Sequence, residues 1–393
     1  MHTRRTFLTR TLTGACVLSA APALLGRSAQ AGAGPERIQA LIDGAAARAR
    51  SAQGAKLGLV LGIIGPDAPE GRLLFAGGAG LTSATGAPLP LDAQTSFEIG
   101  SISKVFTSAL AYQRHGPYAG TLGAALGGAV PLSPAVAALE LENLAIYQPG
   151  LPQDNRGGVY PPGAMATLDN LFAYVNGLPG PIPQGTCYAY SNLGWALLAM
   201  ASVGLSGTDT KAFVARYAQA LQAFCGTLGA RDTHVFAPRL RPQLPMGYTH
   251  QWQPLPGNAS YAPTTPPTVG AGGIVSTGAD MLSYLAYNMG RRPGGLTDAA
   301  LAYQQTPSFH ARNCKGGNAP STAYGWFRKA LPTGDGAVTV LNKDGGVRGF
   351  TAWMGFTAWQ GTGQPSSHGV FVLANGPPAV RLGNAALGLL WKA

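Results

Sequence analysis

Apolar positions along this chain follow two different spacings, and stretches of each kind are grouped. Near the start, the runs 56–64 and 72–76 are short, apolar and separated by Gly, Pro and Asp, which predicts a hairpin of buried strands. Near the end, three more strand-like runs follow one another at 337–342, 350–356 and 369–374. We therefore expect one antiparallel sheet that is built from both ends of the chain.

Helical spacing of apolar residues occurs between and around these strands. Residues 115–180, rich in Gly, Pro and Leu, are interpreted as an irregular helical region, and the Pro-dense stretch 240–268 as loop. The predicted fold class is α/β, of the α+β kind, with a sheet flanked by helices and an all-helical subdomain inserted between the two groups of strands. The predicted helices are 35–50, one that begins at Ser101, 191–203, 210–224, 278–289 and 379–391.

The N-terminus has the features of an export signal. Arg4 and Arg5 are followed by hydrophobic residues, as in twin-arginine signals, and the apolar stretch 12–25 leads to a small-x-small cleavage site at 29–31. That stretch is too short for a membrane anchor, and Gly and Pro interrupt it. We expect 1–31 to be removed on export to the periplasm or the cell exterior, without stable membrane insertion.

The mature chain, 32–393, is long enough for one large domain. We assign about 32–100 and 270–393 to its α/β part and about 101–269 to its helical part. The full sequence is 46% hydrophobic and 11% charged, which indicates a folded protein with an ample core. Its 56 glycines and 31 prolines predict many turns and long ordered loops.

The charge balance narrows the range of partners. The formal net charge is +11, and loss of four arginines with the signal lowers it to +7. A mildly basic protein favours anionic surroundings such as the cell wall. No basic run with interleaved aromatics occurs, so nucleic acid is not an expected partner, and the sequence leaves the oligomeric state open.

Three cysteines follow the signal: Cys187, Cys225 and Cys314. An oxidising compartment permits one disulfide among them and leaves one thiol over, but the spacing does not select the pair. There is no Cys-x-x-Cys and no clustered set of histidines. We therefore expect no metal site.

Ser101 and Lys104 form a Ser-x-x-Lys motif within the segment 97–106. Helix positions three residues apart lie on the same face, so Lys104 can reach the Ser101 hydroxyl and accept its proton. The residues around Lys104 are apolar at helical spacing, which predicts a buried lysine in need of a partner. The motif predicts covalent acyl transfer, although a capping serine followed by a surface lysine would give the same pattern.

Two further segments carry candidate chemistry. Tyr190 and Asn192 form a Tyr-x-Asn just before a predicted helix, and Lys343 and Gly345 form a Lys-x-Gly at the end of a predicted strand. Taken singly, Tyr190 also fits a core aromatic, Asn192 a helix cap and 343–346 a hairpin turn. The histidines are scattered, and no Gly-x-Ser-x-Gly elbow accompanies them.

The three motifs occur together and in one order, and with them the chain resembles the penicillin-recognising serine hydrolases, specifically the class C β-lactamase-related branch. The segments 144–152, 183–192 and 271–277 are similar to stretches of that branch, and the likeness covers nearly the whole mature chain. The branch includes β-lactamases, D-alanyl-D-alanine carboxypeptidases and endopeptidases, and esterases. The resemblance implies a β-lactamase/transpeptidase-like fold and a serine hydrolase without metal or cofactor.

The resemblance also implies roles for individual residues. Ser101 would be the nucleophile, and Lys104 and Tyr190 would share its proton, with the general base left open between them. Lys343 would supply positive charge beside Tyr190, which favours the phenolate. Asn192 would bind Lys104 or the substrate amide.

A second group, Asp344, Gly345, Gly346 and Arg348, is expected to contact the substrate. The backbone N–H groups of Ser101 and Gly346 would form the oxyanion hole, where glycine lets a strand edge approach closely. One residue departs from the branch: the middle position of Lys-x-Gly is usually Thr or Ser, whose hydroxyl helps to hold a substrate carboxylate. The carboxylate of Asp344 would repel that group unless a cation such as Arg348 offsets it.

The predicted function is an exported serine hydrolase that works through an acyl-enzyme. Its expected substrate is a D-Ala-D-Ala-type peptide of peptidoglycan or a β-lactam. Because Asp344 disfavours a carboxylate there, a carboxylesterase with the same Ser-Lys-Tyr site is the alternative. A penicillin-binding-fold protein that binds cell-wall fragments without turnover is a third reading, but such a protein has no need for Ser101, Lys104 and Tyr190 together.

Overall fold

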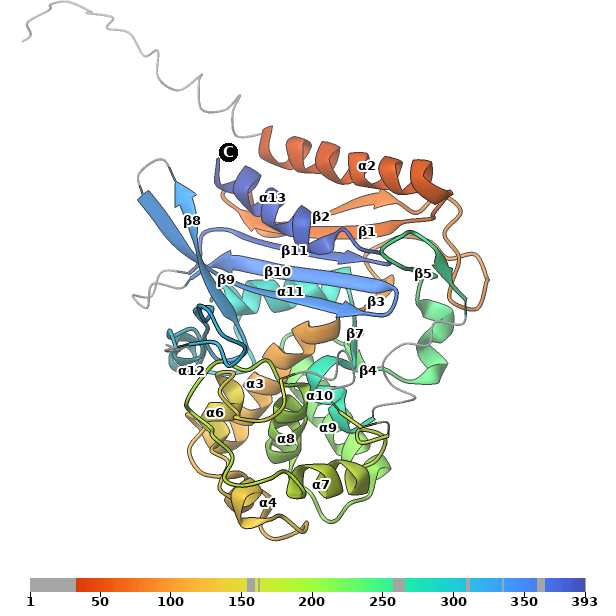
Figure 1. The fold of residues 1–393 in the computed structure, drawn as a ribbon. Helices are drawn as coiled ribbons and strands as arrows, with labels where there is room; N and C mark the ends of the chain where they lie inside the picture. Colours follow the sequence, from red (N-terminus) through yellow and green to blue (C-terminus); the bar gives the residue numbers. More distant parts are fainter. Residues whose placement is uncertain are drawn as a thin grey trace, which may run out of the picture.

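A computed structural model gives the fold of the chain (Figure 1). The predicted export signal, 1–31, lies outside the described residues. The residues that the structure describes are 33–153, 160–161, 163–256, 266–308, 312–333, 336–358 and 365–392.

The largest element is an antiparallel sheet with the strand order β2-β1-β11-β10-β9-β8. The first two strands come from the start of the chain and the others from its end, so the prediction of one sheet built from both ends is confirmed. The strands are β1 (Gly58–Gly65), β2 (Ala68–Gly77), β8 (Phe327–Thr333), β9 (Gly336–Val347), β10 (Phe350–Thr357) and β11 (Gly369–Ala374).

The three strands expected at the end of the chain are β9, β10 and β11, but a fourth strand, β8, precedes them and was not predicted. This edge strand contains Arg328, Lys329 and Pro332, so no apolar run marks it in the sequence, and edge positions tolerate such residues. Strand β9 also continues through the Lys-x-Gly motif to Val347 instead of ending there, and the turn to β10 is made at Gly349, where φ is +92°.

Helices cover both faces of this sheet. Helices α2 (Ala33–Gln53) and α13 (Ala379–Trp391) lie on one face and α11 (Gly278–Asn288) on the other (Figure 1). Every residue of β1 is buried, and successive side chains point to opposite faces. Leu59 and Leu61 join the apolar cluster with α2 and α13, whereas Val60 belongs to the larger cluster that extends into the helical part.

The predicted helical insertion follows the first hairpin. Helix α8 (Asn192–Val203) is apolar on every side and lies at its centre, against α3 (Ser103–His115). A small sheet, β3-β7-β4, joins the insertion to the main sheet. The other elements are β3 (Ser96–Glu98), η1 (Gly100–Ile102), α4 (Leu122–Leu126), α5 (Pro134–Ala137), α6 (Leu141–Ala145), α7 (Leu168–Asn176), α9 (Thr210–Thr227), β4 (His234–Val235), η3 (Pro238–Gln243), β5 (Gly247–Tyr248), β6 (Pro254–Leu255), η4 (Pro266–Thr268), α10 (Val269–Gly272), β7 (Ile274–Thr277) and α12 (Asp298–Gln304).

The irregular character expected for 115–180 is seen as the short helices α4 to α7. Within the described ranges, no helix combines the length and the apolar character that a membrane crossing requires.

Candidate active site

Ser101 lies in the single 3₁₀ turn η1, one turn ahead of α3 and not within the α-helix itself. Lys104 is in the first turn of α3 with no exposed surface, and its Nζ lies 3.0 Å from Ser101 Oγ. The side chain of Ser103 fixes this junction, since its Oγ donates to the Gly100 carbonyl (2.7 Å) and accepts from the backbone of Ile274 (3.1 Å). The expected Ser-Lys pair is therefore formed, between a half-buried serine and a buried lysine.

Two further acceptors surround the Lys104 amine. Its Nζ donates to Asn192 Oδ1 at 2.8 Å and to the Ala271 carbonyl at 2.5 Å. Asn192 is the first residue of α8, and the preceding Ser191 is the N-cap, whose side chain accepts from Gly194 N–H at 3.1 Å. Asn192 thus has a role besides that of starting a helix, because its side chain reaches the buried lysine.

Tyr190 completes the contact with the serine. Its Oη donates to Ser101 Oγ at 2.6 Å, so the serine oxygen lies between the tyrosine hydroxyl and the Lys104 amine. The Lys104 Nζ lies 4.8 Å from the centre of the Tyr190 ring, and the Lys343 Nζ lies 5.5 Å from it. Both distances are within the range of a cation–π interaction.

Tyr147 supports Tyr190 from behind. Its ring is fully buried and lies nearly parallel to that of Tyr190, with 5.8 Å between centroids and 18° between planes. Phe327 stacks on Tyr147 as well, and Tyr147 Oη donates to the Gly325 carbonyl at 2.7 Å. Tyr147 has a φ of +65°, a backbone conformation that few non-glycine residues adopt.

The backbone around Ser101 packs directly on β9. A Cβ on Gly345 would lie 1.9 Å from the Ile99 carbonyl oxygen, and one on Gly100 would lie 2.5 Å from Gly346 N. A Cβ on Gly346, by contrast, would meet nothing within 4 Å. The glycines therefore let the backbone at Ser101 pack closely on β9 at Gly345 and Gly346, with open space beside Gly346. The two N–H groups predicted to form an oxyanion hole belong to residues on either side of this contact.

Lys343 and Asp344 lie on opposite sides of β9. The Lys343 side chain is 1% exposed and that of Asp344 is 54% exposed. The Lys343 ammonium donates to the Asp344 backbone carbonyl at 2.8 Å and lies 3.5 Å from Asp344 Oδ1. Its charge, partly opposed by burial, holds the pKa of the Asp344 carboxyl below the ordinary value.

Arg348 does not take the position expected for it. It is exposed and lies in the turn after β9, where it lines a separate cavity of about 230 Å³ with Tyr248 and His250. Within the described ranges, the cation paired with Asp344 is Lys343, and Arg348 forms no ion pair with it. The cation that pairs with Asp344 is thus a buried lysine below the exposed carboxylate, and not Arg348.

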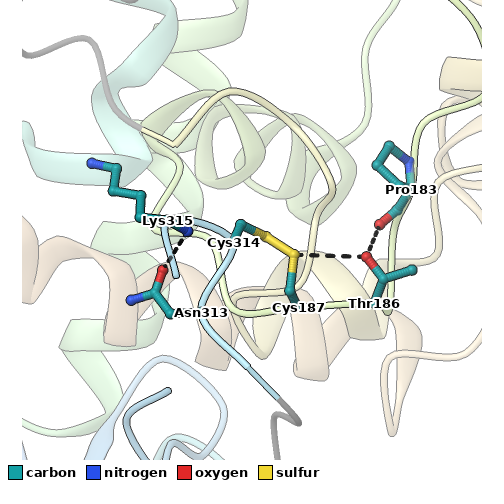
Figure 2. The surroundings of a disulfide bond; sticks show 6 residues. All are labelled: Pro183, Thr186, Cys187, Asn313, Cys314 and Lys315. Atoms are coloured by element: carbon teal, nitrogen blue, oxygen red, sulfur yellow. Dashed lines mark hydrogen bonds between the residues drawn. A yellow bond between two sulfur atoms is a disulfide. The ribbon is translucent and has the colours of Figure 1, made fainter. Parts of the chain in front are cut away.

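A disulfide fixes the loop that leads to Tyr190. Cys187 pairs with Cys314, with 5.3 Å between their Cα atoms (Figure 2). Cys225 is left as a buried thiol. Beside the bridge, Tyr188 N–H donates to the Arg312 carbonyl at 2.9 Å and the Tyr188 carbonyl accepts from Cys314 N–H at 3.0 Å. These bonds tie the Tyr190 loop to the segment that precedes β8.

The structure thus brings together most of the residues that the motifs singled out. Two residues to which the sequence analysis gave no role contact this group. Tyr147 stacks on Tyr190, and the Ala271 carbonyl accepts a hydrogen bond from Lys104. Both lie in segments noted for resemblance, 144–152 and 271–277. A backbone acceptor and a buried ring leave no chemical signature in a sequence. The residues brought together are Ser101, Lys104, Tyr190, Asn192, Lys343, Asp344, Gly345 and Gly346.

Comparison with known proteins agrees with this geometry. The family model described as Beta-lactamase matches residues 45–391. A curated beta-lactamase from Providencia stuartii is 27% identical over 216 residues, which are 51% of this chain and 49% of the relative. The match therefore spans about half the length of that curated relative.

Solved structures extend the likeness to the whole fold. A class C beta-lactamase superposes with a TM-score of 0.67 at 18% identity, over 91% of this chain and 96% of the other. The D-alanine carboxypeptidase AmpC from Burkholderia cenocepacia gives a TM-score of 0.64 at 20% identity, over 91% and 99% of the two chains. The predicted β-lactamase/transpeptidase-like fold is confirmed, and the chain belongs to the beta-lactamase family.

Proposed function

We propose that this chain is a serine hydrolase that acts through an acyl-enzyme on Ser101. The observation that carries the proposal is the position of Ser101 Oγ between Lys104 Nζ at 3.0 Å and Tyr190 Oη at 2.6 Å. A hydroxyl is a weak nucleophile, and two proton-exchanging groups within hydrogen-bond distance are what it needs to become a strong one. A protein that only binds cell-wall fragments has no use for this arrangement.

The first half of the reaction is acylation. Ser101 Oγ attacks the carbonyl carbon of the substrate, and its proton passes to Lys104. Asn192 Oδ1 and the Ala271 carbonyl can accept both protons of a neutral Lys104 amine, which leaves the nitrogen lone pair for the serine. Tyr190 then delivers a proton to the leaving group as the tetrahedral intermediate collapses.

The intermediate carries a negative oxygen, which the N–H groups of Ser101 and Gly346 would stabilise. Water then attacks the acyl-enzyme, loses a proton to the same pair of side chains and releases the acid product. Lys343, buried beside the Tyr190 ring, keeps positive charge next to the proton path throughout.

Membership of the beta-lactamase family supports a D-Ala-D-Ala-type peptide of peptidoglycan or a β-lactam as substrate. One observation favours a second candidate, a carboxylesterase with the same site. Asp344 places an exposed carboxylate on the strand that would bind the substrate, and a substrate with a carboxylate at that point would be repelled. We further propose that the protein works outside the cytoplasm, on the basis of its twin-arginine N-terminus.

The test is to incubate the protein with a fluorescent penicillin, a chromogenic cephalosporin and a p-nitrophenyl ester. Each reagent is applied to the parent protein, to Ser101→Ala and to Ser51→Ala, which removes an exposed serine from α2 on the far side of the sheet. Intact-mass measurement then locates any acyl group.

Cephalosporin turnover supports a β-lactamase, slow stable labelling by penicillin supports a peptidase, and ester turnover alone supports an esterase. In each case Ser101→Ala should lose the reaction and Ser51→Ala should retain it. Turnover that survives in Ser101→Ala, or an acyl group on another residue, would refute the proposed mechanism.

A further inference from the structure

The edge of β9 beside Ser101 is not paired with another strand in the described part of the chain. Strand β8 pairs with β9 only as far as Asn342, which lies opposite Phe327. From Lys343 to Val347, β9 has β10 on one side and no strand on the other within the described residues. A substrate bound at Ser101 therefore lies against this part of β9.

Asp344 is the exposed charged side chain on this part of β9. It lies two residues from Gly346, on the same side of β9 and about 7 Å from it along the strand. The cation paired with it, Lys343, has a side chain that is 1% exposed, whereas the Asp344 side chain is 54% exposed. The positive charge of Lys343 is thus buried below β9, and the negative charge of Asp344 is exposed at the surface where a substrate would bind.

Aromatic rings lie where the pairing of β8 with β9 ends, since Phe327 is opposite Asn342, two residues before Asp344 on β9. Tyr188 is half-buried, with its ring 5.9 Å from that of Tyr147 and 6.4 Å from that of Phe327. Burial, with further contributions from Tyr190 and Asp344, raises the pKa of Tyr188, so its side chain is a neutral phenol. A carboxylate next to aromatic faces is the combination that binds ammonium groups in proteins.

We propose that Asp344, with Tyr188 beside it, forms a subsite for a positively charged group on the leaving-group side of the substrate. This inference rests on the proposed acyl-enzyme function and specifies its substrate class. The enzyme then favours acyl compounds whose leaving group carries an ammonium, accepts neutral ones less well and disfavours those with a carboxylate. The Thr or Ser usual at this position in the resembling branch would have no such preference for a cation.

The test uses three phenylacetyl esters that differ only in the leaving group. The leaving groups are 3-hydroxybenzoate, 3-hydroxybenzamide and 3-hydroxyphenyltrimethylammonium, which are anionic, neutral and cationic. In each reaction the Ser101 Oγ–carbonyl bond forms, the ester C–O bond breaks and the phenol leaves with a proton. Water then releases phenylacetic acid.

The quantity measured is kcat/KM for the cationic and the anionic ester, each divided by that for the neutral ester. These normalised values are compared between the parent protein and Asp344→Asn, which keeps the shape and removes the charge. Because the same esters are used with both proteins, the parent's normalised kcat/KM divided by that of Asp344→Asn does not depend on how reactive each phenol is as a leaving group. We expect the cation-to-anion ratio to fall roughly tenfold in Asp344→Asn, and the parent's ratio to fall towards that of the variant at high ionic strength.

The matched control is Asp43→Asn, on α2 across the sheet, which makes the same change in net charge. It should leave the ratio as in the parent protein. A second measurement uses binding without turnover. The two charged phenols, 3-hydroxybenzoate and 3-hydroxyphenyltrimethylammonium, serve as competitive inhibitors on the leaving-group side, and phenylmethaneboronic acid, which forms a tetrahedral adduct on Ser101 Oγ, reports on the nucleophile alone. Asp344→Asn should weaken the cationic phenol relative to the anionic one.

The outcomes separate the two proposals. Ser101-dependent ester hydrolysis with a ratio that is the same in the parent, Asp344→Asn and Asp43→Asn would overturn the subsite and leave the acyl-enzyme function intact. An equal fall in Asp43→Asn would also overturn it, since net charge and not Asp344 would then set the preference. Hydrolysis that does not need Ser101, or no hydrolysis and no boronate adduct, would overturn both.

Discussion

The ring of Tyr147 lies against the ring of Tyr190, 5.8 Å away and within 18° of parallel, while the Tyr190 hydroxyl contacts Ser101. The mechanism we propose has Tyr190 exchange protons with the serine, which requires its ring to be held in place. Tyr147 is itself held by Phe327 and by the Gly325 carbonyl. The position of the Tyr190 ring is thus set by stacking on Tyr147.

Replacing Tyr147 tests this role. We expect Tyr147→Leu to lower kcat about tenfold with little change in KM, because loss of the stacked ring releases Tyr190. Tyr147→Phe is the matched variant, since it keeps the ring and loses only the hydrogen bond to Gly325, and it should retain most of kcat. Equal kcat for the two variants would show that stacking does not position Tyr190.

Asn192 is predicted to govern the proton state of Lys104. Asn192→Ala removes one acceptor from the amine, and we expect kcat to fall by roughly 10²-fold, as for loss of general-base function. Asn192→Asp puts a negative charge 2.8 Å from the amine, which favours the ammonium. Its pH–rate profile should therefore rise at a higher pH than that of the parent, and an unshifted profile would argue against Lys104 as base.

Gly345 and Gly346 are neighbours with opposite tolerance for a side chain. Gly345→Ala forces a Cβ against the Ile99 carbonyl and must displace the backbone of Ser101, so kcat should fall by at least about 10²-fold and the melting temperature should drop. Gly346→Ala meets open space and should leave the melting temperature unchanged. Thermal denaturation of both variants checks the contrast, and equal losses of stability would contradict it.

The Cys187–Cys314 bridge is expected to stabilise both the fold and the site. The double variant Cys187→Ala/Cys314→Ala should lose about 2–5 kcal/mol of unfolding free energy, because the bridge closes a long loop of the unfolded chain. It should also lose activity, since Tyr188 and Tyr190 share one loop. Chemical denaturation measures the first effect, and Cys225→Ala, which removes the unbridged thiol, controls for the loss of sulfur.

His368 makes stability depend on pH. Burial beside Trp391, with the charge of Arg291, lowers its pKa below the ordinary 6.5, so the folded protein favours the neutral ring. The unfolded chain binds a proton more readily, and stability is therefore lost as the pH falls below about 6.5. Melting temperatures at pH 8 and pH 5 should differ less in His368→Gln than in the parent, and an identical difference would exclude this histidine as a cause.

Much of this fold and site could be predicted from the sequence, since buried strands and helices leave periodic patterns. Lys104 and Tyr190 belong to motifs whose spacing the chemistry dictates. Strand β8 was not predicted, because it is an edge strand whose charged residues and Pro332 interrupt any apolar pattern. The position of Arg348 could not be predicted either. Arg348 is close to Asp344 in sequence, but the turn that follows β9 places it at a separate cavity.

The disulfide also has a topological consequence. Ser101, Lys104 and Tyr190 come from the part of the chain before Gly204, whereas Lys343 and Gly346 come from the part after Cys314. A single backbone cut anywhere between Cys187 and Cys314 leaves the two fragments covalently joined next to the catalytic loop. The two halves of the site would thus remain one molecule after a proteolytic nick, and would separate only when the bridge is reduced.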